Sequence, residues 1–131
     1  MIYVDSCIPM YIVWADHPNK RRVIELAAQL LSSGEHLVSS VEAFQEILRH
    51  YRALRDLTYL HAAYEALETM LVTTADVTKA DVDLARAFAT QYADLSARDC
   101  LHTAVMKRLR CPKIWTFDHG FDQIPSLQRV C

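Results

Sequence analysis

The stretch KIWTFDHGFD, residues 113–122, joins a short apolar run to two carboxylates. The apolar run has the length and composition of a buried strand, and it ends directly on Asp118, with Asp122 close behind. The N-terminus repeats this arrangement, because the apolar residues 1–4 (MIYV) end on Asp5. The sequence therefore predicts two strands that each deliver a carboxylate at their C-terminal end.

The rest of the chain alternates between helical and strand-like segments. Short apolar runs predict strands at 1–4, 36–39, 113–117 and 127–130. The segment 72–78 fits either a strand or an extended link. Helical patterns cover 7–15, 20–34, 40–54, 57–71, 79–93 and 96–110. A loop at residues 16–19 separates the first two. This alternation is typical of an α/β fold, here a three-layer α/β/α sandwich with a short parallel sheet.

Composition narrows the possible functions. The chain has 131 residues, of which 52% are hydrophobic, and this predicts one folded domain over 1–131. Its only glycines, Gly34 and Gly120, exclude glycine-rich phosphate loops. The cysteines form no CxxC pair and are expected to be reduced thiols. No apolar stretch approaches the roughly 20 residues of a membrane helix, and no signal peptide is apparent, so we expect a cytoplasmic location.

Four acids are candidates for a site, and each has an ordinary structural alternative. Asp5 could cap the following helix, and Asp118 could belong to a turn. Asp99 lies three residues after Ser96, as in a capping box. Glu46 is predicted to face solvent, because the apolar stripe of its helix comprises Val41, Phe44, Leu48 and Tyr51.

Taken together, the acids favour metal-dependent chemistry. The C-terminal ends of parallel strands meet at one edge of the sheet, and carboxylates gathered there repel one another unless a cation lies among them. Hard cations such as Mg²⁺ or Mn²⁺ prefer these oxygen ligands, and phosphodiester hydrolysis is the reaction that most often uses them.

Four segments in this order resemble the PIN-domain family, specifically the VapC-like toxins of bacterial toxin–antitoxin pairs: IYVDS (2–6), LVSSVEAFQEIL (37–48), LSARDCLHTAV (95–105) and IWTFDHGFD (114–122). The resemblance covers essentially the whole chain. It implies a compact α/β/α domain and a Mg²⁺- or Mn²⁺-dependent endoribonuclease that cleaves RNA and leaves a 5′-phosphate and a 3′-hydroxyl. It also implies a homodimer and a VapB-like antitoxin that blocks the pocket.

The resemblance also assigns residues. It places the catalytic acids at Asp5, Glu46, Asp99 and Asp118, with the three aspartates holding the metal. It selects Glu46 over Glu42 because Glu46 precedes an apolar pair. Lesser supporting positions are Asp122 and the two hydroxyls of Ser6 and Thr116. One departure is Cys7, where relatives often have Asn, so a polar contact near the pocket is in doubt.

Alternative interpretations remain at this point. The main one is a non-catalytic PIN-like module that binds RNA or a protein. A haloacid-dehalogenase-type phosphatase is disfavoured, since it needs an aspartate where Cys7 stands, and a receiver-domain pattern is absent. His102 and His119 are expected to be packing or surface residues.

Net charge bears on RNA binding. The chain carries a formal charge of −2, which is unusual for a protein that binds phosphate backbones. If four of its 16 acids bind metal, the remaining 12 are outnumbered by 14 Lys and Arg. Candidate backbone contacts are Arg49, His50, Arg52, Arg55, Lys107, Arg108 and Arg110, although for any single one a solvated helix face or compensation of a helix dipole is the favoured interpretation.

Overall fold

A sheet of five strands, all paired in parallel, forms the centre of the computed structural model, which describes residues 1–131. The strand order is β3-β2-β1-β4-β5. The strands are β1 (Ile2–Val4), β2 (Leu37–Ser40), β3 (Thr73–Ala75), β4 (Lys113–Trp115) and β5 (Gln128–Val130). The predicted α/β class is therefore confirmed, and the ambiguous segment 72–78 contains a strand.

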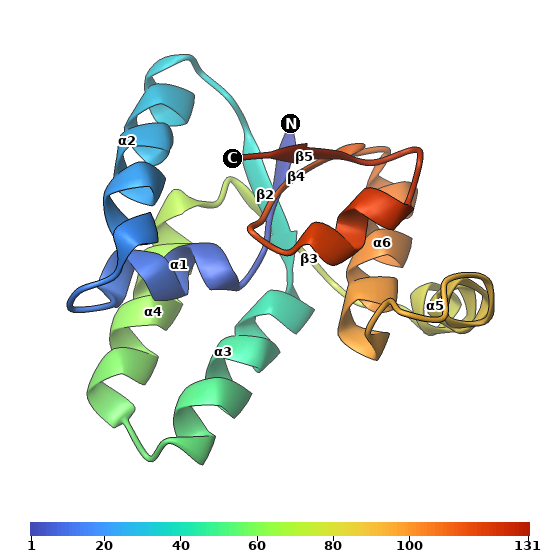
Figure 1. Cartoon of the computed structure of the whole chain (residues 1–131), viewed down its shortest axis with the longest axis horizontal. Helices are drawn as coiled ribbons and strands as arrows, with labels where there is room; N and C mark the ends of the chain where they lie inside the picture. The colour runs from blue at the N-terminus through green and yellow to red at the C-terminus, as the bar shows by residue number, and fades with distance from the viewer.

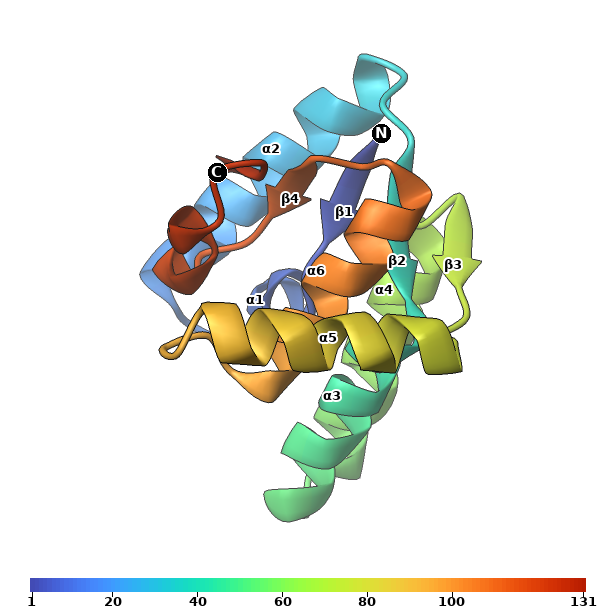
Figure 2. The same cartoon turned by 90° about the vertical axis from the view of Figure 1, so that its right-hand side faces the viewer.

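Helices cover both faces of this sheet, as Figures 1 and 2 show. One face is covered by α1 (Cys7–Val13), α2 (Pro18–Ser32), α3 (Val41–Ala53) and α4 (Leu57–Met70). The other face is covered by α5 (Lys79–Gln91), α6 (Ala97–Leu109) and the short 3-10 helix η1 (His119–Gln123). The chain is thus a three-layer α/β/α sandwich.

The strands alternate strictly between the two hydrophobic cores. Ile2 and Val4 point toward α1–α4, while Tyr3 between them points toward α5 and α6. In β4, Trp115 packs in the core next to α1–α4, and Ile114 packs in the core next to α5 and α6. Because successive side chains of a strand point to opposite faces, strands that are apolar throughout can supply both cores.

Local capping fixes several helix ends. Pro18 occupies the first position of α2 and the His17 ring accepts a hydrogen bond from the Asn19 amide, so α2 begins inside the predicted loop 16–19. The same helix ends before Gly34, whose φ of 75° favours glycine. The Ser96 hydroxyl accepts a hydrogen bond from the Asp99 amide at 3.2 Å, which places Asp99 in the first turn of α6.

The predicted buried face of α3 is wrong in part. Val41 and Leu48 are 42% and 49% exposed, whereas Glu46 is only 6% exposed. The face that is buried consists of Ala43, Phe44, Glu46, Ile47 and Tyr51. Apolar spacing alone could not show this, because α3 meets the sheet, α4 and α6 at once, and its face toward α6 is polar.

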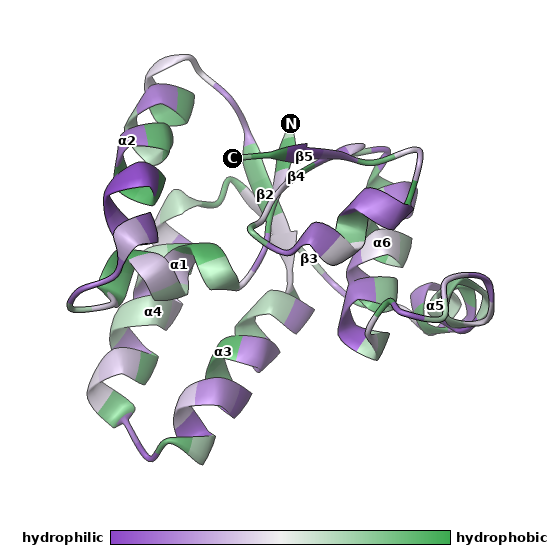
Figure 3. Ribbon diagram, in the orientation of Figure 1, coloured by the Kyte–Doolittle hydropathy of each residue, from purple (hydrophilic) through white to green (hydrophobic).

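Smaller departures affect the other amphipathic helices. The helical spacing of apolar residues favours a core-facing position for Leu31 of α2 and Val82 of α5, yet their exposed fractions are 55% and 48%. Figure 3 shows hydrophilic and hydrophobic stretches side by side on α2, consistent with a helix that lies against the core along one stripe. None of the helices combines the length and apolarity needed to span a bilayer.

Candidate functional site

Strands β1 and β4 bring two of the predicted acids to one edge of the sheet. The strands pair in parallel with Val4 opposite Trp115, and Asp5 follows directly, its amide donating to the Trp115 carbonyl at 3.1 Å. The Thr116 hydroxyl donates to Asp5 Oδ2 at 2.6 Å and accepts from the Asp118 amide at 3.0 Å. One threonine therefore ties the two strand-end aspartates together.

Two helices complete the site. Glu46 comes from the middle of α3 and Asp99 from the first turn of α6. Both line a cavity of about 320 Å³ together with Asp5 and Asp118. The complete lining is Asp5, Ser6, Cys7, Glu46, Asp94, Ser96, Arg98, Asp99, Asp118 and Gly120. The four acids that the sequence singled out thus share one hollow, which we call the acidic cavity.

The acidic cavity holds more negative charge than its surroundings compensate. Burial raises the pKa of Asp5 despite the nearby His102 and the hydrogen bond from Thr116. Burial and the neighbouring carboxylates of Asp118 and Asp5 raise the pKa of Asp99 to about 7. Burial first, and repulsion between neighbouring carboxylates second, therefore disfavour the ionised acids of this cavity. The donor set therefore fits a hard divalent cation, which would relieve that repulsion.

Glu46 differs from the other acids because it has a buried cationic partner. Its Oε1 lies 2.6 Å from Nε2 of His102, and its Oε2 accepts a hydrogen bond from the Ser6 hydroxyl at 2.5 Å. Burial alone would raise the pKa of Glu46, but these hydrogen bonds, together with the charges of His102 and Arg98, outweigh it and lower the value. Burial opposes protonation of His102, yet the carboxylates of Glu46 and Asp5 hold its pKa well above the ordinary value. The prediction of a solvent-facing Glu46 is therefore wrong.

His102 also lies close enough to be considered as a metal ligand. Ligand atoms of Asp5, Glu46 and His102 lie within 4.8 Å of one another. Both ring nitrogens of His102 are already hydrogen-bonded, and the side chain is fully buried. His102 therefore has no nitrogen left for a cation, whereas the carboxylates keep oxygen atoms toward the acidic cavity.

The supporting residues divide between the cavity and the surface. Ser6 lines the acidic cavity, and Thr116 lies directly beneath it. Asp122 does not line it, because its carboxylate is exposed and pairs with Arg129 at 3.1 Å and with His119 at 3.3 Å. The thiol of Cys7 is close to Asp5, and burial together with that carboxylate raises its pKa, so this cysteine is expected to be an unreactive thiol.

The basic residues also separate in the structure. Arg108 donates from both Nε and Nη2 to the buried carboxylate of Asp81, so this ion pair already engages most of its guanidinium. Lys107 and Arg110 remain exposed, as do Arg49, His50 and Arg52 of α3 and Arg55 just beyond its end. Arg98 lines the acidic cavity and was not singled out by the sequence, although it directly precedes Asp99.

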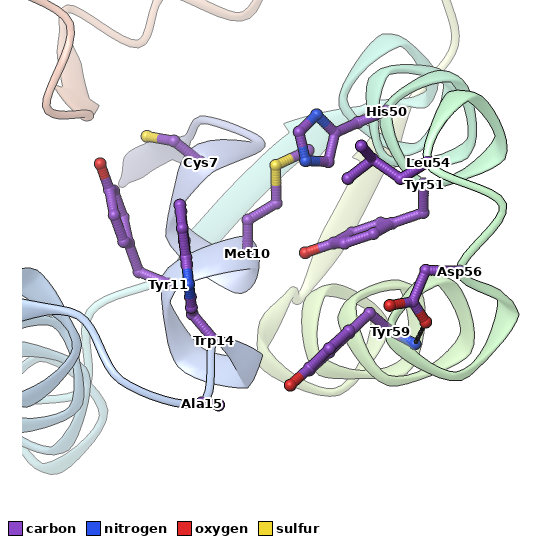
Figure 4. Close-up of a pocket in the computed structure, with 10 residues that line it drawn as sticks. All are labelled: Cys7, Met10, Tyr11, Trp14, Ala15, His50, Tyr51, Leu54, Asp56 and Tyr59. Carbon is purple, nitrogen blue, oxygen red and sulfur yellow. Dashed lines mark hydrogen bonds between the residues drawn. The ribbon is translucent and has the colours of Figure 1, made fainter.

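A second hollow lies beside the acidic cavity between α1 and the hairpin of α3 and α4 (Figure 4). Its volume is about 470 Å³, and its lining is mostly apolar: Cys7, Met10, Tyr11, Trp14, Ala15, His50, Tyr51, Leu54, Asp56 and Tyr59. Trp14 is 49% exposed and stacks on Tyr11 with 5.9 Å between ring centroids. We call this hollow the apolar groove, and it shares Cys7 with the acidic cavity.

Removing one carboxylate should stabilise the protein when no cation is present. A raised pKa means that ionised Asp99 disfavours the fold, so its penalty is absent below pH 4 and complete above pH 7. We expect Asp99→Asn to raise the free energy of unfolding by about 1–2 kcal/mol at pH 8 in EDTA, after allowance for solvent screening. The gain should be smaller at pH 5. Urea unfolding at the two pH values measures it.

The matched control is Asp16→Asn, which removes an exposed acid outside the acidic cavity. This variant should change stability little at either pH, because a surface carboxylate has no comparable burial. A gain for Asp99→Asn that is equal at pH 5 and pH 8 would show that the cost of the ionised carboxylate is not its cause.

Comparison with known proteins agrees with this architecture. The family model described as PIN domain matches residues 2–127. Among curated proteins, Ribonuclease VapC13 of Mycobacterium tuberculosis is 39% identical over 130 residues, which are 99% of each chain. Ribonuclease VapC23 of the same species is 37% identical over 119 residues, covering 91% of this chain and 94% of the relative.

Solved structures share the fold at lower identity. Mycobacterium tuberculosis VapC20, described as a Sarcin-Ricin loop cleaving toxin, superposes with a TM-score of 0.77 at 18% identity over 95% of both chains. The Rickettsia felis VapBC2 complex, bound to a DNA fragment from its promoter, gives a TM-score of 0.72 at 15% identity over 99% and 98% of the two chains. These likenesses support the fold alone.

Proposed function

The chain belongs to the PIN-domain family, and on that premise we propose that it is an endoribonuclease toxin that hydrolyses RNA phosphodiester bonds with a divalent cation, Mg²⁺ or Mn²⁺. The observation that carries the proposal is the convergence of four acids on one cavity from four separate elements. Full-length identity of 39% to proteins named as VapC ribonucleases supports the same conclusion.

The aspartates are the proposed cation ligands. Asp5, Asp99 and Asp118 offer carboxylate oxygens in the acidic cavity, two of them with raised pKa values. When bound, a divalent cation supplies a water of lowered pKa and stabilises charge on the oxygen that leaves. The products of in-line hydrolysis would be a 5′-phosphate and a 3′-hydroxyl.

The other residues of the site orient these ligands. Thr116 holds one oxygen of Asp5, and the Ser6 amide holds the other at 2.7 Å. Glu46, which reaches the cavity from α3, would complete the cation site or support a second ion. Arg98 lies in the same lining, where a guanidinium can meet an RNA phosphate next to the scissile bond.

Regulation by a protein partner forms part of the proposal. Solved structures of similar fold include a toxin–antitoxin complex from Klebsiella pneumoniae, at 13% identity and a TM-score of 0.66. The apolar groove (Figure 4) shares Cys7 with the acidic cavity, so an antitoxin segment seated there would also obstruct the acids. A second copy of the chain could cover Val41, Leu48 and Tyr64, whose apolar side chains are exposed beside one another around a shallow hollow.

The test is cleavage of a labelled pool of tRNA and ribosomal RNA by purified protein. We expect cleavage with Mg²⁺ or Mn²⁺ and none in EDTA. The Asp5→Asn variant, purified in parallel, separates the enzyme from a contaminating nuclease, since it should be inactive with either metal. Circular dichroism spectra of the two proteins should coincide.

A folded, partner-free protein that cuts no RNA with either metal would instead favour the alternative function, a non-catalytic module that binds RNA or protein. In that case Mn²⁺ binding and RNA binding, measured separately, would show which of the two properties the acidic cavity retains.

A further inference from the structure

A line of hydrogen-bonded side chains runs from the interior of the sheet to Glu46. The Ser40 hydroxyl lies 2.8 Å from the Tyr3 hydroxyl, which lies 2.6 Å from Nδ1 of His102. On the other side of the ring, Nε2 lies 2.6 Å from Glu46 Oε1. Ser40, Tyr3 and His102 each have an exposed fraction of 0%. These three residues, here called the buried brace, come from β2, β1 and α6.

The buried brace lies behind the acidic cavity without lining it. None of its three members lines the acidic cavity or the apolar groove. An ionised carboxylate only accepts hydrogen bonds, so His102 Nε2 must donate to Glu46. The other ring nitrogen, Nδ1, is hydrogen-bonded to the Tyr3 hydroxyl. His102 therefore has no free nitrogen, and its direct hydrogen bond to the site is the one to Glu46.

Glu46 is held at both oxygens, which leaves its side chain one orientation. His102 holds Oε1, and the Ser6 hydroxyl holds Oε2. Ser6 is in turn next to Asp5, whose Oδ1 accepts from the Ser6 amide. The orientation of Glu46 toward Asp5 thus depends on His102 from behind and on Ser6 from the side. If His102 were removed, a buried carboxylate would lose its only charged partner and would turn away or take up a proton.

We propose that His102, held in place by Tyr3, is a positioning residue that fixes the Glu46 carboxylate toward the acidic cavity and so sets how tightly a divalent cation binds there. The inference rests on the proposed function for the identity of the site. Residues that orient carboxylate ligands from behind typically affect metal affinity or activity by roughly 10–100-fold. His102 acts on the site through its hydrogen bond to Glu46, and Tyr3 acts by holding the His102 ring.

Three substitutions separate positioning from packing. His102→Leu removes both hydrogen bonds while keeping an apolar side chain of similar size. His102→Gln keeps an N–H group that can reach Glu46. Tyr3→Phe removes only the hydroxyl that fixes the ring. Met106→Leu is the matched control, because Met106 is also fully buried in α6 and keeps its volume after the change.

The first readout is Mn²⁺ affinity, measured by electron paramagnetic resonance without RNA. We expect His102→Leu to weaken Mn²⁺ binding roughly 10–100-fold and Tyr3→Phe to weaken it about threefold. His102→Gln should recover most of the loss, and Met106→Leu should bind as the wild type does. In single-turnover cleavage with saturating RNA and fixed Mn²⁺, His102→Leu should lower the rate, and higher Mn²⁺ should restore part of it.

Several outcomes would overturn the proposal. A folded His102→Leu protein with wild-type Mn²⁺ affinity would do so, and so would a His102→Gln variant as weak as His102→Leu. If His102→Leu does not fold, Tyr3→Phe decides, and unchanged Mn²⁺ affinity in that variant overturns the proposal. Wild-type protein that binds no Mn²⁺ also overturns it.

The proposed nuclease function can fail independently. If the wild type binds Mn²⁺ in a His102-dependent way yet cleaves no RNA, the positioning inference is supported and the nuclease function is not.

Discussion

Asp118→Asn is expected to lower the rate of RNA cleavage by roughly 1,000-fold, equivalent to about 4 kcal/mol of transition-state stabilisation. The side chain lines the acidic cavity at the end of β4, where a charged oxygen is needed to hold a cation. An amide keeps the shape and most hydrogen bonds but supplies no charge. Its own Oδ1 can still accept from the Gly120 amide, as Asp118 does at 2.8 Å. Single-turnover cleavage at saturating Mg²⁺ measures the loss.

The matched control for this prediction is Asp122→Asn, four residues further along the same segment. Asp122 is exposed and pairs with Arg129 and His119 outside the acidic cavity. Its substitution should leave the cleavage rate within about twofold of the wild type and change stability little, since exposed ion pairs contribute little. Equal losses for the two variants would mean that the segment as a whole, and not the Asp118 carboxylate, supports cleavage.

Arg108→Met is expected to lower the free energy of unfolding by about 2–3 kcal/mol at pH 7. Arg108 donates to both carboxylate oxygens of Asp81 and to the Asp76 carbonyl, which ties α6 to the start of α5. The Asp81 side chain is only 3% exposed, so without its partner it would be a buried, uncompensated charge. The loss should be smaller than for a fully buried ion pair because Arg108 itself is 39% exposed.

Two comparisons test the cause of this loss. The neighbouring Lys107→Met, which removes an exposed charge, should cost far less. Adding Asp81→Asn to Arg108→Met should restore part of the stability, because the unpaired charge is then gone. A double variant no more stable than Arg108→Met would indicate that lost packing of the guanidinium stem is the cause.

The pH dependence of the stability that the Arg108–Asp81 pair contributes follows from the direction in which the pKa of Asp81 is shifted. The hydrogen bonds from Arg108 lower the pKa of Asp81 in the folded protein, so its stabilising contribution is present above the unfolded value near 4. The contribution disappears as the pH falls through the lower folded value. The stabilities of wild type and Arg108→Met, measured by urea unfolding, should therefore converge toward acid pH.

Segments with a strong local pattern were predictable from the sequence. Short apolar runs that end on Asp5 and Asp118 gave two strands of the sheet, and the parallel pairing then required both carboxylates at one edge. Turn and cap residues such as Pro18, Ser96 and Gly34 act on their immediate neighbours, so the helix ends near them were predictable to within a few residues. These features depend on interactions between residues close together in the chain.

The sequence by itself thus determined the α/β class, most elements and, with the family resemblance, the four acids of the cavity. Only the tertiary structure decided that Glu46 is buried against His102 and that Arg108 is occupied by Asp81. It also decided that Asp122 lies outside the acidic cavity. The reason is that helical periodicity reports how polar one face of a helix is, but not what lies opposite it. Glu46 is buried because α6 brings it a hydrogen-bond donor from 56 residues away.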